Sequence, residues 1–172
     1  RPALSLIMER LPATLHLGAV GIAISVVFAV PIGIYAAVRR STWLDAFARG
    51  FAVLGQSVPT FWLGILLIFV FAVVFDLLPS YGRYSPTSVI LPAFTLGYFI
   101  TAGIMRLTRS AMLDVLDSEY IKFARIKGVA ESGVIWKHAF KNAAIPVLTF
   151  SMFLFIHMIG GAVITETVFS WP

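Results

Sequence analysis

The side chains with the most chemistry to offer lie in residues 106–142, which carry seven of the chain's 13 basic residues. Apolar residues recur at helical spacing in the first part of this stretch, which predicts an amphipathic helix. They are Leu107, Ala111, Met112, Val115 and Leu116. Tyr120, Phe123 and Ala124 are expected to prolong the apolar stripe. Gly128 then interrupts it, as a helix C-cap or a tight turn does.

A second short helix is expected after Gly128, with Ser132 as its N-cap. Pro146 suits the first turn of the apolar helix that follows. Arg109 and Asp114 are expected to pair on the surface of the first helix. Two short helices around a glycine would form a rigid projection that fits a groove on a partner. Periodicity alone slightly favours the alternative, a solvated loop with short helical ends.

No residues in the sequence are spaced for catalysis. The phosphate-binding pattern G-x-x-x-x-G-K-[ST] is absent, so the chain is not expected to hydrolyse ATP unaided. The chain has no cysteine, which excludes disulfides and thiolate metal sites. No Ser/His/Asp order or cluster of metal ligands stands out either. We therefore expect no catalytic residue, no metal site and no cofactor, and we expect that the chain is not an enzyme.

The composition points to a membrane as the solvent of this chain. Hydrophobic residues make up 59% of the 172 residues, and charged residues only 12%, against about 25% in soluble domains. Four windows contain no charged residue, and each exceeds the roughly 20 residues that a spanning helix needs. These windows are Leu11–Val38, Gly50–Phe75, Tyr84–Met105 and Asn142–Thr165. The sequence predicts an all-α, polytopic transmembrane bundle with four helices.

The basic residues predict how the bundle is oriented. Three of them lie in residues 39–49 and seven in residues 106–142, so ten of the 13 fall on one side of the predicted helices. The positive-inside rule assigns that side to the cytoplasm and residues 76–88 to the outside. The net charge of +5 is explained by this topology, without nucleic acid. A chain that begins outside is expected to lack an earlier helix, and we expect truncation at both ends.

The second window contains a polar segment at membrane depth. Gln56, Ser57, Pro59 and Thr60 interrupt its apolar run. Polar groups inside a membrane face protein or a water-filled path rather than lipid. These four residues are therefore candidates for lining a pathway.

Longer runs around these features resemble one family of membrane proteins. Residues 120–128 (YIKFARIKG) and 136–146 (WKHAFKNAAIP) resemble the "EAA" loop of binding-protein-dependent ABC importer permeases. The interval from Gly128 to Pro146 resembles the long glycine-to-proline spacing of the dipeptide, oligopeptide and nickel branch of this family. Residues 56–64 (QSVPTFWLG), 78–82 (LPSYG), 91–97 (LPAFTLG), 106–112 (RLTRSAM) and 160–172 (GGAVITETVFSWP) resemble further segments of that family in the same order.

The resemblance implies a specific architecture and role. Residues 1–172 would form a single ABC type-1 transmembrane domain, with four of six helices visible and residues 106–142 as its coupling region. The coupling residues would dock into an ATPase subunit. They are Tyr120, Ala124, Arg125, Lys127, Gly128, His138, Asn142 and Pro146. Phe123 and Ile126 depart from the family pattern, which more often has a small residue and alanine there.

The family resemblance also implies partners and a location. The partners would be two ABC ATPase subunits, a paralogous permease and an extracytoplasmic solute-binding protein, in the inner (plasma) membrane of a bacterium or archaeon. Transport would proceed by alternating access. The uncharged windows favour di- or oligopeptides over nickel, because a metal path would offer imidazoles, thiolates or carboxylates. A secondary transporter and an intramembrane enzyme are more remote alternatives, since no window holds an acid.

Overall fold

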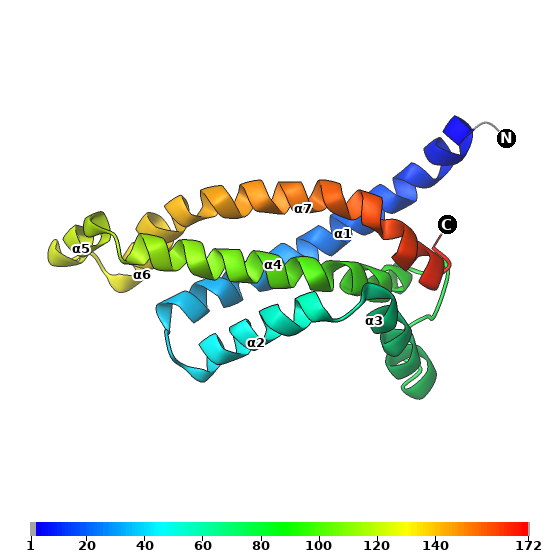
Figure 1. The fold of residues 1–172 in the computed structure, drawn as a ribbon, viewed down its shortest axis with the longest axis horizontal. Coiled ribbons are helices and arrows are strands. Elements are labelled where there is room, and N and C mark those ends of the chain that lie inside the picture. The colour runs from blue at the N-terminus through cyan, green and yellow to red at the C-terminus, as the bar shows by residue number, and fades with distance from the viewer. Residues whose placement is uncertain (1–2, 172) are drawn as a thin grey trace.

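The computed structural model describes residues 3–171, and all regular structure in that range is helical. Three long helices, α1 (Ala3–Val38), α4 (Ile90–Leu116) and α7 (Lys141–Val168), run side by side (Figure 1). With the short turns that extend two of them, they give three segments long and apolar enough to cross a membrane: 8–38, 86–116 and 131–168. The all-α transmembrane fold is confirmed.

The helix α4 lies at the centre of the bundle, in contact with α1, α7 and the shorter α2 (Trp43–Ser57). Small residues let the backbones approach closely, as is usual between membrane helices. A Cβ atom added at Gly55 of α2 would lie 2.5 Å from the Cβ atom of Ala102. The Ser25 hydroxyl donates to the carbonyls of Gly21 and Gly97, at 2.8 and 2.9 Å, and so ties α1 to α4. We call α1, α2, α4 and α7 the bundle.

The second uncharged window is a bent pair of helices and not one straight span. The helix α2 ends at Ser57, and a 104° bend separates it from the next helical segment, residues 60–74. That segment consists of α3 (Thr60–Leu67) and, continuing it, the π-helix η1 (Ile68–Val74). Pro59 is the N-cap of α3, and Val58 before it is extended, with ψ 122°. A residue before proline avoids the helical region, which explains the break. Of the four predicted spanning helices, three are continuous spans, and the fourth is a span only if this bent pair is counted as one.

The connections gather at the two ends of the bundle. The turn after α1 and residues 117–140 lie at one end, whereas residues 76–89 and the C-terminal residues 169–171 lie at the other (Figure 1). At that second end, the backbone N–H of Gly82 donates to the carbonyl of Phe169 at 3.0 Å. The chain therefore alternates between ends as the predicted topology requires. Which end faces the cytoplasm stays a prediction.

Residues 117–140, which we call the elbow, project beyond the bundle (Figure 1). They comprise α5 (Glu119–Ile126), α6 (Glu131–Gly133) and the π-helix η3 (Val134–Phe140). Two local predictions are wrong. Ala130 and not Ser132 is the N-cap of α6. Pro146 lies inside α7 and not in its first turn, because the helical path already begins at Glu131 and runs through η3.

Candidate functional site

The elbow is built around a glycine turn. Gly128 has a φ of +79°, a left-handed conformation that costs a side-chain-bearing residue energy. The N–H of Val129 donates to the carbonyl of Ala124 at 3.2 Å, and that of Gly128 to the carbonyl of Arg125 at 3.0 Å. This pair of bonds is a Schellman motif, which closes the C-terminus of α5. The predicted helix C-cap at Gly128 is confirmed, and Lys127 precedes it as an exposed residue.

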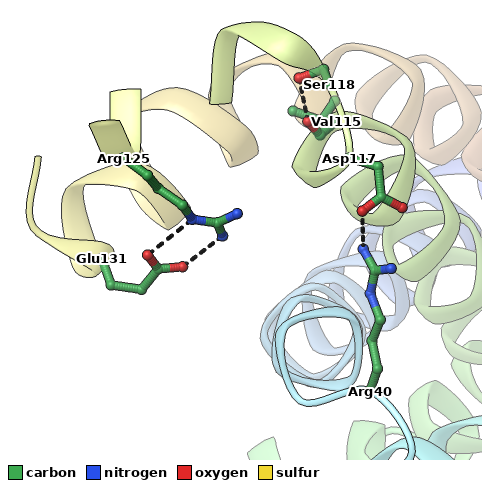
Figure 2. A network of polar contacts seen from close by, with 6 residues as sticks. All are labelled: Arg40, Val115, Asp117, Ser118, Arg125 and Glu131. Carbon is green, nitrogen blue, oxygen red and sulfur yellow. Dashed lines mark hydrogen bonds and ion pairs between the residues drawn. The ribbon is translucent and has the colours of Figure 1, made fainter. Parts of the chain in front are cut away.

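An ion pair spans this turn. Arg125 donates through Nη2 to Oε1 of Glu131 at 2.8 Å and through Nε to Oε2 at 3.2 Å (Figure 2). This bidentate geometry holds α5 and α6 in one relative orientation. The hydrogen bond to Glu131 raises the pKa of Arg125 above its ordinary value. Arg125 was a predicted coupling residue, but its partner Glu131 was not. Opposite charges three residues before and after a turn glycine are the signal that could have found it.

Apolar anchors fix the elbow to the end of the bundle. Ile121 of α5 and Val134 and Ala139 of η3 are fully buried, packed with residues of α1, α4 and α7. Ala124 is half-buried beside them. The predicted apolar stripe is therefore only partly right. The side of α5 that packs inward carries Ile121 and Ala124, whereas Tyr120 and Phe123 are exposed.

A polar contact joins the start of the elbow to the start of α7. Nδ2 of Asn142 donates to the hydroxyl oxygen of Tyr120 at 2.7 Å and to the carbonyl of His138 at 3.3 Å. Three predicted coupling residues thus meet at one place, although they lie up to 22 positions apart. Pro146, in the second turn of α7, is exposed and lies outside this contact.

The elbow exposes three large apolar side chains among its charged ones. Phe123 is 61% exposed, Ile126 80% and Trp136 46%, on a frame that the buried anchors hold in place. Exposed apolar side chains grouped on a projection are typical of a protein-binding surface. Phe123 and Ile126 are among the positions that depart from the family pattern, and both are larger than the residues more often found there. The elbow therefore offers a partner more apolar area than that pattern implies.

A second ion pair links the bundle to the root of the elbow. Arg40, just after α1, donates to Oδ1 of Asp117 at 2.8 Å (Figure 2). The hydrogen bond from Arg40 holds the pKa of Asp117 below its usual value. The next residue, Ser118, donates to the carbonyl of Val115 at 2.5 Å and is the N-cap of α5. The root of the elbow is therefore tied to both α1 and α4.

The candidate pathway residues lie at the break between α2 and α3. Gln56 and Ser57 end α2, Pro59 precedes α3 and Thr60 begins it, with all but the half-buried Thr60 exposed. Oε1 of Gln56 accepts a hydrogen bond from Nη1 of Arg106 on α4 at 3.4 Å. The break thus exposes neutral polar groups beside α4. Their role in lining a pathway stays a prediction.

One buried charge was missed by sequence reasoning. Asp45 near the start of α2 has a side chain only 3% exposed, and its Oδ1 lies 2.6 Å from Nε of Arg109 on α4. The backbone N–H of Ser41 also donates to it at 3.2 Å. Arg109 was expected to pair with Asp114, and that expectation is wrong. An acid in the first turn of a helix could have drawn attention to Asp45, but that position gives no signal of its partner.

The apolar spans, the broken helix and the projecting elbow define a multi-pass membrane protein. Residues 29–172 match the family described as "Binding-protein-dependent transport system inner membrane component", and the chain belongs to that family. The resemblance predicted from the sequence is confirmed.

Several named proteins are similar over the whole chain. The glutathione transport system permease protein GsiC of Escherichia coli (strain K12) is 42% identical over 172 residues, which are 100% of this chain and 56% of the relative. A provisionally named peptide transport system permease protein of Brucella abortus (strain 2308) is 41% identical over 181 residues, covering 100% of this chain and 57% of the relative. The chain thus spans a little over half the length of these relatives.

Proposed function

We propose that this chain is the permease subunit of an ATP-driven importer, and that it moves di- or oligopeptides across the inner membrane by alternating access. Residues 1–172 belong to one ABC type-1 transmembrane domain, and residues 106–142 form its coupling region. ATP is hydrolysed by separate ATPase subunits, and this chain itself is not an enzyme. A paralogous permease completes the pathway, and an extracytoplasmic solute-binding protein delivers the peptide.

The observation that carries this proposal is the construction of the elbow. A projection meant only as a connection needs neither a bidentate ion pair nor three fully buried anchors. This one has both, and it presents Phe123, Ile126 and Trp136 to whatever lies beyond the bundle. An elbow that is anchored to the bundle and exposes large apolar side chains suits docking into a groove of a nucleotide-binding partner. Closure of that partner would then tilt the helices joined to the elbow.

The preference for peptides has two supports. The relatives carry names that state peptide or glutathione transport. In addition, residues 3–171 contain no group of three or more His, Asp or Glu side chains placed to hold a metal ion. Nickel ions would need such donors along a dedicated route. Neutral groups such as Gln56 and Thr60 instead let a hydrated, zwitterionic peptide pass without being trapped.

The test is reconstitution of the full-length permease with its paralogue, ATPase subunits and binding protein into liposomes. We expect uptake of a labelled tripeptide that requires ATP and all four kinds of component. Uptake driven by a proton gradient without ATP would show a secondary transporter instead. Release of a chemically altered peptide would show an intramembrane enzyme. A binding protein that holds nickel tightly and ignores short peptides would overturn the peptide assignment alone.

A further inference from the structure

A basic cleft lies between α2 and α4, near the end of the bundle that carries the elbow. Its volume is about 360 Å³. Three arginines line it: Arg49 from α2, and Arg106 and Arg109 from α4. Gln56, one of the candidate pathway residues, lines it as well. The proposed function makes no use of these arginines.

The cleft holds more positive charge than its own acid neutralises. Asp45 is engaged by Arg109 at 2.6 Å and lies 3.6 Å from Arg49. Nη1 of Arg106 donates to the neutral amide oxygen of Gln56 at 3.4 Å. Three guanidinium groups line the cleft, and the carboxylate of Asp45 beside it contacts two of them, which leaves an excess of two positive charges. Arginine pairs with carboxylates in fixed geometry, so this excess suits an incoming anion.

The position of the cleft favours a solute over a lipid. Arg106 follows directly after the uncharged window Tyr84–Met105, which places it at the edge of the membrane core. The cleft shares Gln56 with the break after Ser57. The opposite side of the α2–α4 contact is different, because a cavity there is lined almost entirely by apolar residues. Its lining includes Phe28, Phe47, Phe51 and Phe94. Exposed polar groups at this depth indicate a water-filled path.

We infer that the cleft formed by Arg49, Arg106 and Arg109 binds carboxylate groups of the transported peptide and favours peptides of net negative charge. This inference rests on the proposed function and adds a charge preference to it. Arg49 and Arg106 contact the solute, whereas Arg109 is a positioning residue held by Asp45. The excess charge draws an acidic peptide toward the inner end of the path, where dilution and solvent release it.

The experiment compares two dipeptides that differ by one carboxylate, Ala-Glu and Ala-Gln, in the reconstituted full transporter. The solute-binding protein contributes the same factor to the uptake ratio in every permease variant. A change in that ratio therefore belongs to the permease. In R49Q/R106Q the ratio of Ala-Glu to Ala-Gln uptake should fall about two- to fivefold, the range that one exposed ion pair supplies. R49K/R106K keeps both charges and should retain most of the preference.

The matched control is R10Q/R39Q, which removes the same charge at two residues that do not line the cleft. This control should leave the ratio unchanged. An unchanged ratio in a transporting R49Q/R106Q variant would overturn the inference and leave the proposed function standing. Absence of ATP-dependent peptide uptake by the wild type would overturn both.

A lipid phosphate is the other anion that such a cleft takes. The two dipeptides are therefore also compared in vesicles with and without phosphatidylglycerol. If R49Q/R106Q lowers uptake of both peptides equally, and only where phosphatidylglycerol is present, the cleft binds a lipid headgroup and the inference is wrong. A ratio that changes equally in both kinds of vesicle supports it.

Discussion

The bundle and the elbow use charged side chains in opposite ways. In the bundle, Asp45 and Arg109 pair with their side chains 3% and 23% exposed. In the elbow, Arg125 and Glu131 pair with side chains 43% and 56% exposed. Removing one partner of a largely buried pair leaves the other charge unpaired, which costs several kcal/mol, whereas an exposed pair contributes at most about 1 kcal/mol. The bundle therefore depends on its ion pair for stability, and the elbow depends on its turn and anchors for shape.

The largest effect is expected from removing the buried acid. Asp45→Ala should destabilise the permease by about 3 kcal/mol, because the largely buried guanidinium of Arg109 is left without its carboxylate partner. Thermal unfolding of the detergent-solubilised full-length permease measures this loss. Asp114→Ala, at an exposed acid on α4, is the control and should change stability by less than about 0.5 kcal/mol. Equal losses in both variants would contradict a special role of the buried pair in stability.

The second prediction concerns the turn of the elbow. Gly128→Val should cost about 1–2 kcal/mol at this position, because a side chain in the left-handed region clashes with its own backbone. No atom lies within 4 Å of an added Cβ, so the penalty comes from conformation and not from crowding. We expect normal membrane insertion with ATP hydrolysis that no longer drives peptide uptake.

Gly128→Asn is the matched control, because asparagine tolerates the left-handed conformation better than other side chains. It should retain most of the coupling between hydrolysis and uptake. The stronger variants Gly128→Pro and Gly128→Trp should behave like Gly128→Val. Full transport by Gly128→Val would show that the turn need not be rigid.

A smaller effect is expected from the exposed pair. Arg125→Glu places two acids across the turn and should loosen the elbow by less than about 1 kcal/mol. Faster tryptic cleavage after Lys127, followed by mass spectrometry, detects this loosening. Exchange of both charges in Arg125→Glu/Glu131→Arg should restore slow cleavage. Cleavage that stays fast in the exchanged variant would mean that the elbow is not held by this pair.

The smallest effect concerns pH. Because Arg40 lowers the pKa of Asp117 in the folded protein, the pair contributes fully above the ordinary pKa of aspartate. The contribution is lost progressively as the pH falls below that value and through the lowered folded-state pKa of Asp117. The difference in unfolding temperature between wild type and Asp117→Asn should therefore be constant from pH 8 to 5, well above the model-peptide pKa of about 3.9. A difference that disappears within this range would contradict the lowered pKa of Asp117 beside Arg40.

The sequence predicted backbone features better than side-chain pairs. The uncharged windows marked the spans, and Gly128 marked the turn, because both reflect constraints that act locally along the chain. The proline-broken segment at Pro59 was noticed, but its 104° bend depends on how α3 packs against α4 and α7. The pair between Asp45 and Arg109 joins residues 64 positions apart, which no local pattern encodes.

The length of α4 amplifies small movements at the elbow. A helix of 27 residues is about 40 Å long at 1.5 Å per residue. Because one end of this rod joins the elbow through Asp117, it works as a lever whose far end lies beside the opposite loop. Geometry converts a tilt of about 5° into a shift of about 3.5 Å at the far end of such a rod. If a partner docks on the elbow as proposed, a modest rotation there would be enough to shift side chains at the opposite end of the bundle.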